Sequence, residues 1–150
     1  MEGAFGNTIS FSCRSKKGRS ESIKKELIDY RRDRAKETLK DAKILFNKGS
    51  LFSTVNRIYY AVFYEVNALL LTKNLSSSKH SGVLSIFNKE FVKQELVSKD
   101  LGKLYNRMFE FRQKSDYEEF SEFEREDVER WLKQAEKFIE EVEKVISKIG

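Results

Sequence analysis

The chain has no proline among its 150 residues and only seven glycines, and this constrains its fold more than any other feature. Proline interrupts the hydrogen bonds of a helix interior and commonly marks loops, so a chain without it suits long helices joined by short connections. Charged residues make up 35% of the chain and are rich in Lys and Glu, which favour exposed helix faces. Because a chain of this length typically forms one domain, the sequence predicts a single all-α domain.

Apolar residues recur at three- and four-residue spacing in five segments, which is the pattern of amphipathic helices. The predicted helices are 21–48, 52–73, 79–93, 99–117 and a last helix from 121 to near the C-terminus. The second is apolar on more than one face, so it is predicted to be central and buried. We expect a mostly antiparallel five-helix bundle over residues 21–150. Residues 1–20 show no period and end in a basic cluster, so they are predicted to be a flexible tail.

Three sequence signals predict where helices begin or end. Ser20 is of the type that caps a helix N-terminus, and Gly49 stands where a residue just beyond a helix C-terminus belongs. The segment Ser121–Glu124 (SEFE) matches the capping-box pattern, which places the start of the last helix there.

Several classes of site are excluded by residue type. The single cysteine, Cys13, cannot form an internal disulfide, and a cytoplasmic location is the default expectation. The single histidine, His80, excludes a histidine-based metal centre. No glycine-rich phosphate loop is present, and no apolar run approaches the length of a membrane span. We therefore expect no metal, no cofactor and no membrane partner.

Charge is unevenly distributed along the chain. The net charge is +5, yet residues 118–150 carry eleven acidic and six basic side chains, so the positive excess lies in the preceding residues. A solvated surface explains this distribution. Contact with RNA, nucleotide phosphate or an acidic partner explains it as well, and both interpretations stay open.

Arg112 stands out because it continues the apolar stripe of the fourth predicted helix. One turn beyond Met108 the stripe reaches Arg112, and one further turn reaches Asp116, with Tyr117 following. Residues four apart share a helix face, so Asp116 is placed to pair with the arginine. The pair either closes the helix end as an internal ion pair or presents a phosphate-binding arginine oriented by its aspartate.

Two further residues have a structural and a functional interpretation. His80 opens the third predicted helix, where it is either a capping or surface residue or part of a site; the helix N-terminus there disfavours its charged form. Arg57 lies on the otherwise apolar second helix. It either forms an ion pair with the first or fourth helix or belongs to a site.

Three motifs in order resemble the prokaryotic HEPN family over roughly residues 28–147. They are RIYYAVF at 57–63, KHSGV at 79–83 and RQKSDY at 112–117. The last two are similar to an uncharacterised HEPN subfamily. The resemblance implies an antiparallel helical bundle that dimerises, with a polar groove near the dimer interface. It also implies a partner, since many such proteins act with a minimal nucleotidyltransferase as a toxin–antitoxin pair.

The resemblance bears on the chemistry of Arg112. Ribonuclease members of the family carry an arginine followed after four to six residues by a histidine. Here the fifth position after Arg112 is Tyr117, and no histidine follows. Toxin members carry an adenylate-accepting tyrosine two residues beyond that histidine, an offset that Tyr117 does not match.

Two functions therefore stay open, and with them whether the chain is an enzyme. The first is a toxin-like or accessory partner of a nucleotidyltransferase that binds nucleotide or RNA phosphate around Arg112. The second is a ribonuclease that uses Arg112 with a non-standard proton-transfer residue. In both, the candidate site consists of Arg112, Asp116 and Tyr117, with His80 nearby. A homodimer is expected from the resemblance and from the aromatic residues near this segment, which are Phe109, Phe111, Phe120 and Phe123.

Overall fold

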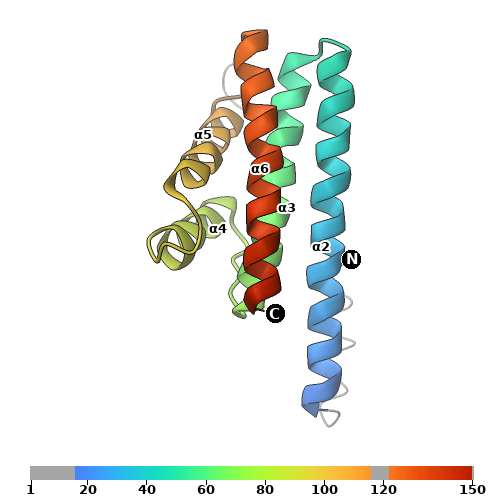
Figure 1. The fold of residues 1–150 in the computed structure, drawn as a ribbon, viewed down its shortest axis with the longest axis vertical. Coiled ribbons are helices and arrows are strands. Elements are labelled where there is room, and N and C mark those ends of the chain that lie inside the picture. The colour runs from blue at the N-terminus through green and yellow to red at the C-terminus, as the bar shows by residue number, and fades with distance from the viewer. Residues whose placement is uncertain (1–15, 116–121, 150) are drawn as a thin grey trace.

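The protein is an all-α bundle, as predicted. The structure, a computed structural model, describes residues 16–115 and 122–149, and no strand occurs within them. The elements, labelled as in Figure 1, are α2 (Lys16–Asn47), α3 (Leu51–Thr72), α4 (His80–Phe87), the π-helical turn η2 (Asn88–Val92), α5 (Lys99–Ser115) and α6 (Arg125–Ile149). The predicted helix 79–93 corresponds to α4 followed directly by η2.

Three long helices, α2, α3 and α6, lie side by side, and α4 and α5 flank them on one side (Figure 1). A short turn joins α2 to α3, so these two helices are antiparallel, and the early turns of α2 extend beyond the end of α6. Helix α3 packs against α2, α4, α5 and α6, which makes it the central helix, as its apolar faces predicted. None of the described helices combines the length and the apolar character that a membrane crossing needs.

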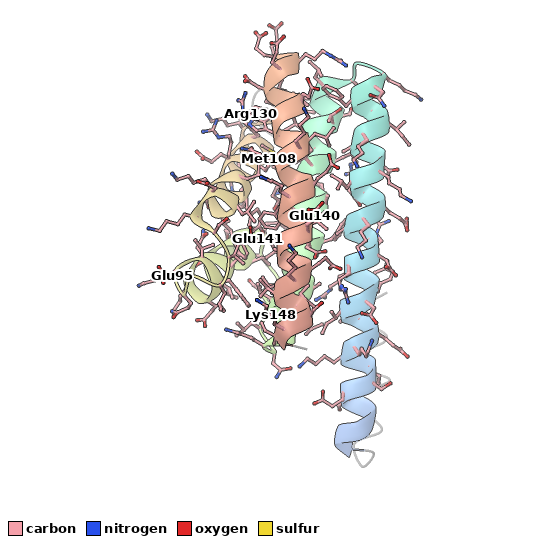
Figure 2. The ribbon with its side chains drawn as sticks, viewed as in Figure 1. Glu95, Met108, Arg130, Glu140, Glu141 and Lys148 are labelled. Atoms are coloured by element: carbon pink, nitrogen blue, oxygen red, sulfur yellow. The ribbon has the colours of Figure 1, made fainter. Side chains whose placement is uncertain are left out.

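The core follows from the apolar stripes of the sequence. On α3, every position from Ala68 to Leu70 is fully buried, and α6 buries its stripe from Val128 to Ile146 against α3 and α2. The opposite side of α6 is charged and faces solvent. Figure 2 shows Arg130, Glu140 and Lys148 projecting from that helix at different levels.

The helix ends differ in part from those predicted. Gly49 has φ +83°, and the amides of Gly49 and Ser50 donate to the carbonyls of Phe46 and Leu45, the hydrogen-bond pattern of a glycine-terminated helix. That prediction is confirmed. The Ser20 cap is wrong, because α2 already begins at Lys16 and Ser20 lies inside it.

The capping-box start is wrong as well, because α6 begins at Arg125. The amides of Asp127 and Val128 donate to the carbonyl of Glu124, so the last residue of the SEFE segment accepts the first helical hydrogen bonds.

One acidic side chain, Glu65, is completely buried in the core. Glu65 of α3 is 0% exposed, and neither of its carboxyl oxygens has a hydrogen-bond partner. Burial raises its pKa, and the neighbouring carboxylate of Glu143 raises it further. Glu65 is therefore neutral at ordinary pH.

Glu143 of α6 takes the opposite ionisation state, because α2 supplies it with cations. Arg32 donates to it from Nε and Nη2 at 2.8 and 2.7 Å, and Lys36 Nζ lies 3.2 Å away. Burial opposes its ionisation, but the hydrogen bonds from Arg32 and Lys36 outweigh burial and lower the pKa of Glu143. The charged carboxylate of Glu143 thus joins α6 to α2, beside the neutral carboxyl group of Glu65.

Replacing Glu65 with glutamine should make the protein less sensitive to alkaline pH. The pKa of Glu65 is higher in the folded protein than in the unfolded chain. Its contribution to stability is therefore complete below the unfolded-state pKa and is lost as pH rises toward the folded-state pKa. Between about pH 6 and about pH 8, the wild type should lose up to about 1.4 kcal/mol per pH unit relative to Glu65→Gln. Urea unfolding at both pH values measures the difference.

The matched control is Glu129→Gln on the exposed side of α6, where the carboxylate is half-exposed and pairs loosely with Lys133. This variant should follow the wild type at both pH values, since an exposed pair contributes little. Parallel pH dependence of Glu65→Gln and the wild type would show that Glu65 is ionised in the fold.

Candidate functional site

Arg112 lies across two tyrosines of the central helix. Its Nε donates to the Tyr60 hydroxyl at 3.2 Å, and its guanidinium carbon lies 5.5 Å from the ring centroid of Tyr59 and 5.8 Å from that of Tyr60. Stacking on aromatic faces suits a guanidinium, which is planar and weakly hydrated. The arginine is thus held by α3 as well as by its own helix, α5, and it is half-buried.

His80 reaches the same two tyrosines from the start of α4. Its ring stacks on Phe63 with a centroid distance of 4.2 Å and an interplanar angle of 4°, and its Nδ1 lies 2.7 Å from the Tyr59 hydroxyl. The ring also lies edge-on to Tyr60. Because Tyr59, Tyr60 and Phe63 occupy neighbouring positions on α3, that helix brings His80 and Arg112 together.

Burial and charge make His80 neutral. Its pKa is lowered, first by burial and second by the positive charge of Arg112. A neutral imidazole agrees with the position of His80 at the start of α4, where the sequence predicted it. Burial likewise raises the pKa of Tyr59, so its hydroxyl stays protonated.

A close contact between Gly82 and Ser77 shapes the turn that carries His80. A Cβ atom on Gly82 would overlap the Ser77 hydroxyl oxygen and lie 2.9 Å from Ser77 Cβ. The same hydroxyl oxygen accepts a hydrogen bond from the amide of Lys79 at 3.2 Å. Any larger residue at position 82 would require Ser77 to move.

Two more arginines lie over tyrosines beside this cluster. Arg34 of α2 lies 5.1 Å from the Tyr64 ring and donates to its hydroxyl at 3.5 Å, and Arg57 lies 5.1 Å from the Tyr60 ring. Neither forms an ion pair within residues 16–115 and 122–149. The ion pair considered for Arg57 is therefore wrong for the described residues; its guanidinium donates to the Asn56 side chain at 2.8 Å.

The aromatic residues near Arg112 pack within the chain. Phe111 and Phe123 contact each other and Trp131, and Phe123 also contacts Phe52. They border a pocket of about 10 Å³ beside Arg112, which has room for about one water molecule. Phe109 also packs against the core, and all three residues, Phe109, Phe111 and Phe123, remain partly exposed.

The structure brings together some of the predicted site residues. His80 and Arg112 lie on the same two tyrosines, whereas Asp116 and Tyr117, like Phe120, lie outside the described residues. Among the described side chains, no group of three His, Cys, Asp or Glu residues is arranged to hold a metal ion. The sequence interpretation placed Tyr59, Tyr60 and Phe63 on an apolar helix and in a family motif, but it did not assign them to the site. The two hydroxyl groups close to Arg57 in the sequence were the available signal.

Residues 28–145 match the HEPN domain. The chain belongs to the HEPN domain family. The match covers most of the chain and includes every residue of the Arg112–His80 cluster, and it agrees with the all-helical bundle.

Curated relatives agree with this assignment. The chain is 58% identical over 123 residues to a UPF0332 protein of Thermotoga maritima, covering 82% of this chain and 93% of that protein. It is 38% identical over 114 residues to a Methanocaldococcus jannaschii protein named "Putative toxin MJ0142", covering 76% of this chain and 78% of the relative. A second protein of that organism, "Putative toxin MJ0605", is 36% identical over 115 residues, covering 77% and 85%.

In this HEPN protein, Gly82→Ala should displace the turn that carries His80. The added methyl group would meet Ser77, and overpacking of this kind costs about 1–3 kcal/mol of unfolding free energy. Thermal unfolding measures the loss. Adding Ser77→Gly should restore most of it, because both contacting side-chain atoms are then removed. A Gly82→Ala protein as stable as the wild type would show that the turn has room to adjust.

Proposed function

We propose that this HEPN protein is the toxin-like component of a toxin–antitoxin-type pair with a minimal nucleotidyltransferase, and that it binds nucleotide or RNA phosphate around Arg112. The observation that carries the proposal is the position of Arg112 over Tyr59 and Tyr60, with neutral His80 on the same tyrosines. A guanidinium offers planar, charge-assisted hydrogen bonds that match a phosphate.

The surroundings of Arg112 support an anionic ligand. Arg57 lies on Tyr60, Arg34 lies on the adjoining Tyr64, and the net positive charge of the chain comes from residues that precede the acidic last helix. A positive field of this kind raises the local concentration of phosphate groups. The relatives named as toxins support the toxin-like part of the proposal.

The same proposal includes a homodimer in the cytoplasm. Its support is family membership together with the half-exposed side of α3, which carries Tyr60 and Tyr64. Light scattering at micromolar concentration should give twice the chain mass of 17.7 kDa. A monomer mass would refute the homodimer and would not affect the proposed phosphate site.

A ribonuclease is the second candidate, because His80 lies beside Arg112 although the family histidine after the arginine is absent. Cleavage of RNA in the presence of a chelator would support it, provided that His80→Ala abolishes the cleavage. Toxicity in cells without any RNA cleavage by the purified protein would support the first candidate.

Arg112→Ala should weaken AMP binding by about 10-fold or more, since a hydrogen bond to a charged group contributes about 1.5–3 kcal/mol. Toxicity on expression should be lost with it. Calorimetric titration with AMP and a growth assay measure both effects. The matched control is Arg130→Ala, which removes an exposed arginine on α6 whose partner is Asp127, and this variant should bind AMP like the wild type.

Thermal melts separate a functional arginine from a structural one. If Arg112 pairs with Asp116 only to hold the fold, Arg112→Ala should destabilise by about 3–5 kcal/mol and the double change with Asp116→Ala should recover most of that loss. Such a recovery, with AMP binding and toxicity unchanged, would refute the proposed function.

A further inference from the structure

The hydrogen bond between Tyr59 and His80 determines which imidazole nitrogen carries the proton. Tyr59 is 1% exposed, and the 2.7 Å contact with His80 Nδ1 is the single hydrogen bond of its hydroxyl within residues 16–115 and 122–149. A buried hydroxyl needs an acceptor for its hydrogen, and Nδ1 is the acceptor it has. If Nδ1 donated instead, the hydroxyl hydrogen would be buried without a partner.

The other ring nitrogen is not fully buried. His80 Nε2 has no hydrogen-bond partner among the described residues, and it is not one of the three buried side-chain atoms without a partner, which are both carboxyl oxygens of Glu65 and the hydroxyl of Tyr105. Stacking on Phe63 holds the ring plane, so the direction of Nε2 is held as well. In a neutral ring whose Nδ1 accepts, Nε2 carries the hydrogen.

We infer that His80 acts as an Nε2–H hydrogen-bond donor and that, together with Arg112, it forms a binding site with two donors for one phosphate group. Tyr59 is the positioning residue that selects this tautomer. The inference rests on the proposed function and specifies the chemistry of the same site. In this site, neutral His80 donates a hydrogen bond in a fixed direction, and Arg112 supplies the positive charge.

This assignment distinguishes His80 from a general base. Its Nδ1 is occupied by the Tyr59 hydroxyl, and its Nε2 already carries a hydrogen, so the neutral ring has no open nitrogen to accept a proton. The lowered pKa of His80 agrees with this, because burial and Arg112 oppose the addition of a second proton. A hydrogen-bond donor beside an arginine instead complements the oxygens of a bound phosphate.

Nuclear magnetic resonance tests the tautomer without any ligand, because His80 is the single histidine of the chain. In protein labelled with ¹⁵N-histidine, the two ring nitrogens should show a protonated Nε2 and an unprotonated Nδ1 at neutral pH. Tyr59→Phe should introduce the Nδ1–H form as a second, exchanging population. Tyr105→Phe is the matched control: it removes another buried tyrosine hydroxyl, one without a partner, and should leave the ring signals unchanged.

Inorganic phosphate, used as the probe, tests the donor role. Addition of phosphate should shift the Nε2–H signal, and His80→Ala should weaken phosphate binding by about 3- to 10-fold, the equivalent of about one hydrogen bond. Because a glutamine amide nitrogen can occupy the place of Nε2 and still donate, His80→Gln should keep binding within about threefold of the wild type. A residue required as a base would lose its role equally in both variants.

Three results would overturn the inference. These are a dominant Nδ1–H tautomer in the wild type, unchanged ring signals in folded Tyr59→Phe, and equal loss of phosphate binding in His80→Gln and His80→Ala. The wild-type spectrum decides the tautomer even if Tyr59→Phe fails to fold. Loss of phosphate binding in Arg112→Ala alongside any of these results would leave the proposed function intact, whereas unchanged binding in Arg112→Ala would refute the proposed function itself.

Discussion

Burial of α3 is the constraint on which the rest of the fold depends. Helix Leu51–Thr72 is apolar on several sides, so a single neighbouring helix cannot remove its surface from water. Helices α2 and α6 cover it along its length, and α4 and α5 cover part of what remains. The order of the helices along the chain is compatible with this arrangement. The segment α4–η2–α5 follows α3 and lies at one side of the bundle, and the chain then packs against α3 again as α6.

The same helix carries the strongest exception to an apolar core. Glu65 is buried there, and its neutral state follows first from burial and second from the nearby Glu143 carboxylate, which Arg32 and Lys36 keep charged. A buried polar group of this kind is expensive compared with an apolar side chain of similar size. It also specifies which faces of α2, α3 and α6 can meet, since any other register would leave the carboxyl groups without the cations of α2.

Helix α3 also links the core to the candidate site. Tyr59 is buried as a core residue, yet its hydroxyl contacts His80, and Tyr60 one position later contacts Arg112 at the edge of the bundle. The histidine and the arginine thus obtain their orientation from side chains whose own positions are determined by core packing. Groups held in this way need little reorganisation to bind a ligand.

Much of the fold was predictable from the sequence because helix periodicity is local. The apolar stripes predicted the helices and their central member, and Gly49 predicted the end of α2 through its left-handed backbone conformation. The starts of α2 and α6 were not predictable from Ser20 or the SEFE segment. A capping residue indicates only that a helix can begin at its position. The actual start depends on which turns of the helix pack against the bundle.

For the site, the sequence by itself determined that an arginine interrupts an apolar stripe at position 112 and that a single histidine opens a helix at position 80. It also determined membership of the HEPN family, which the match over residues 28–145 shows. Only the tertiary structure decided that Arg112 and His80 lie on the same two tyrosines, and that the Tyr59 hydroxyl occupies Nδ1. The physical reason is that these contacts join three helices, α3, α4 and α5. How three helices cross depends on their packing, which the apolar periodicity of one helix does not predict.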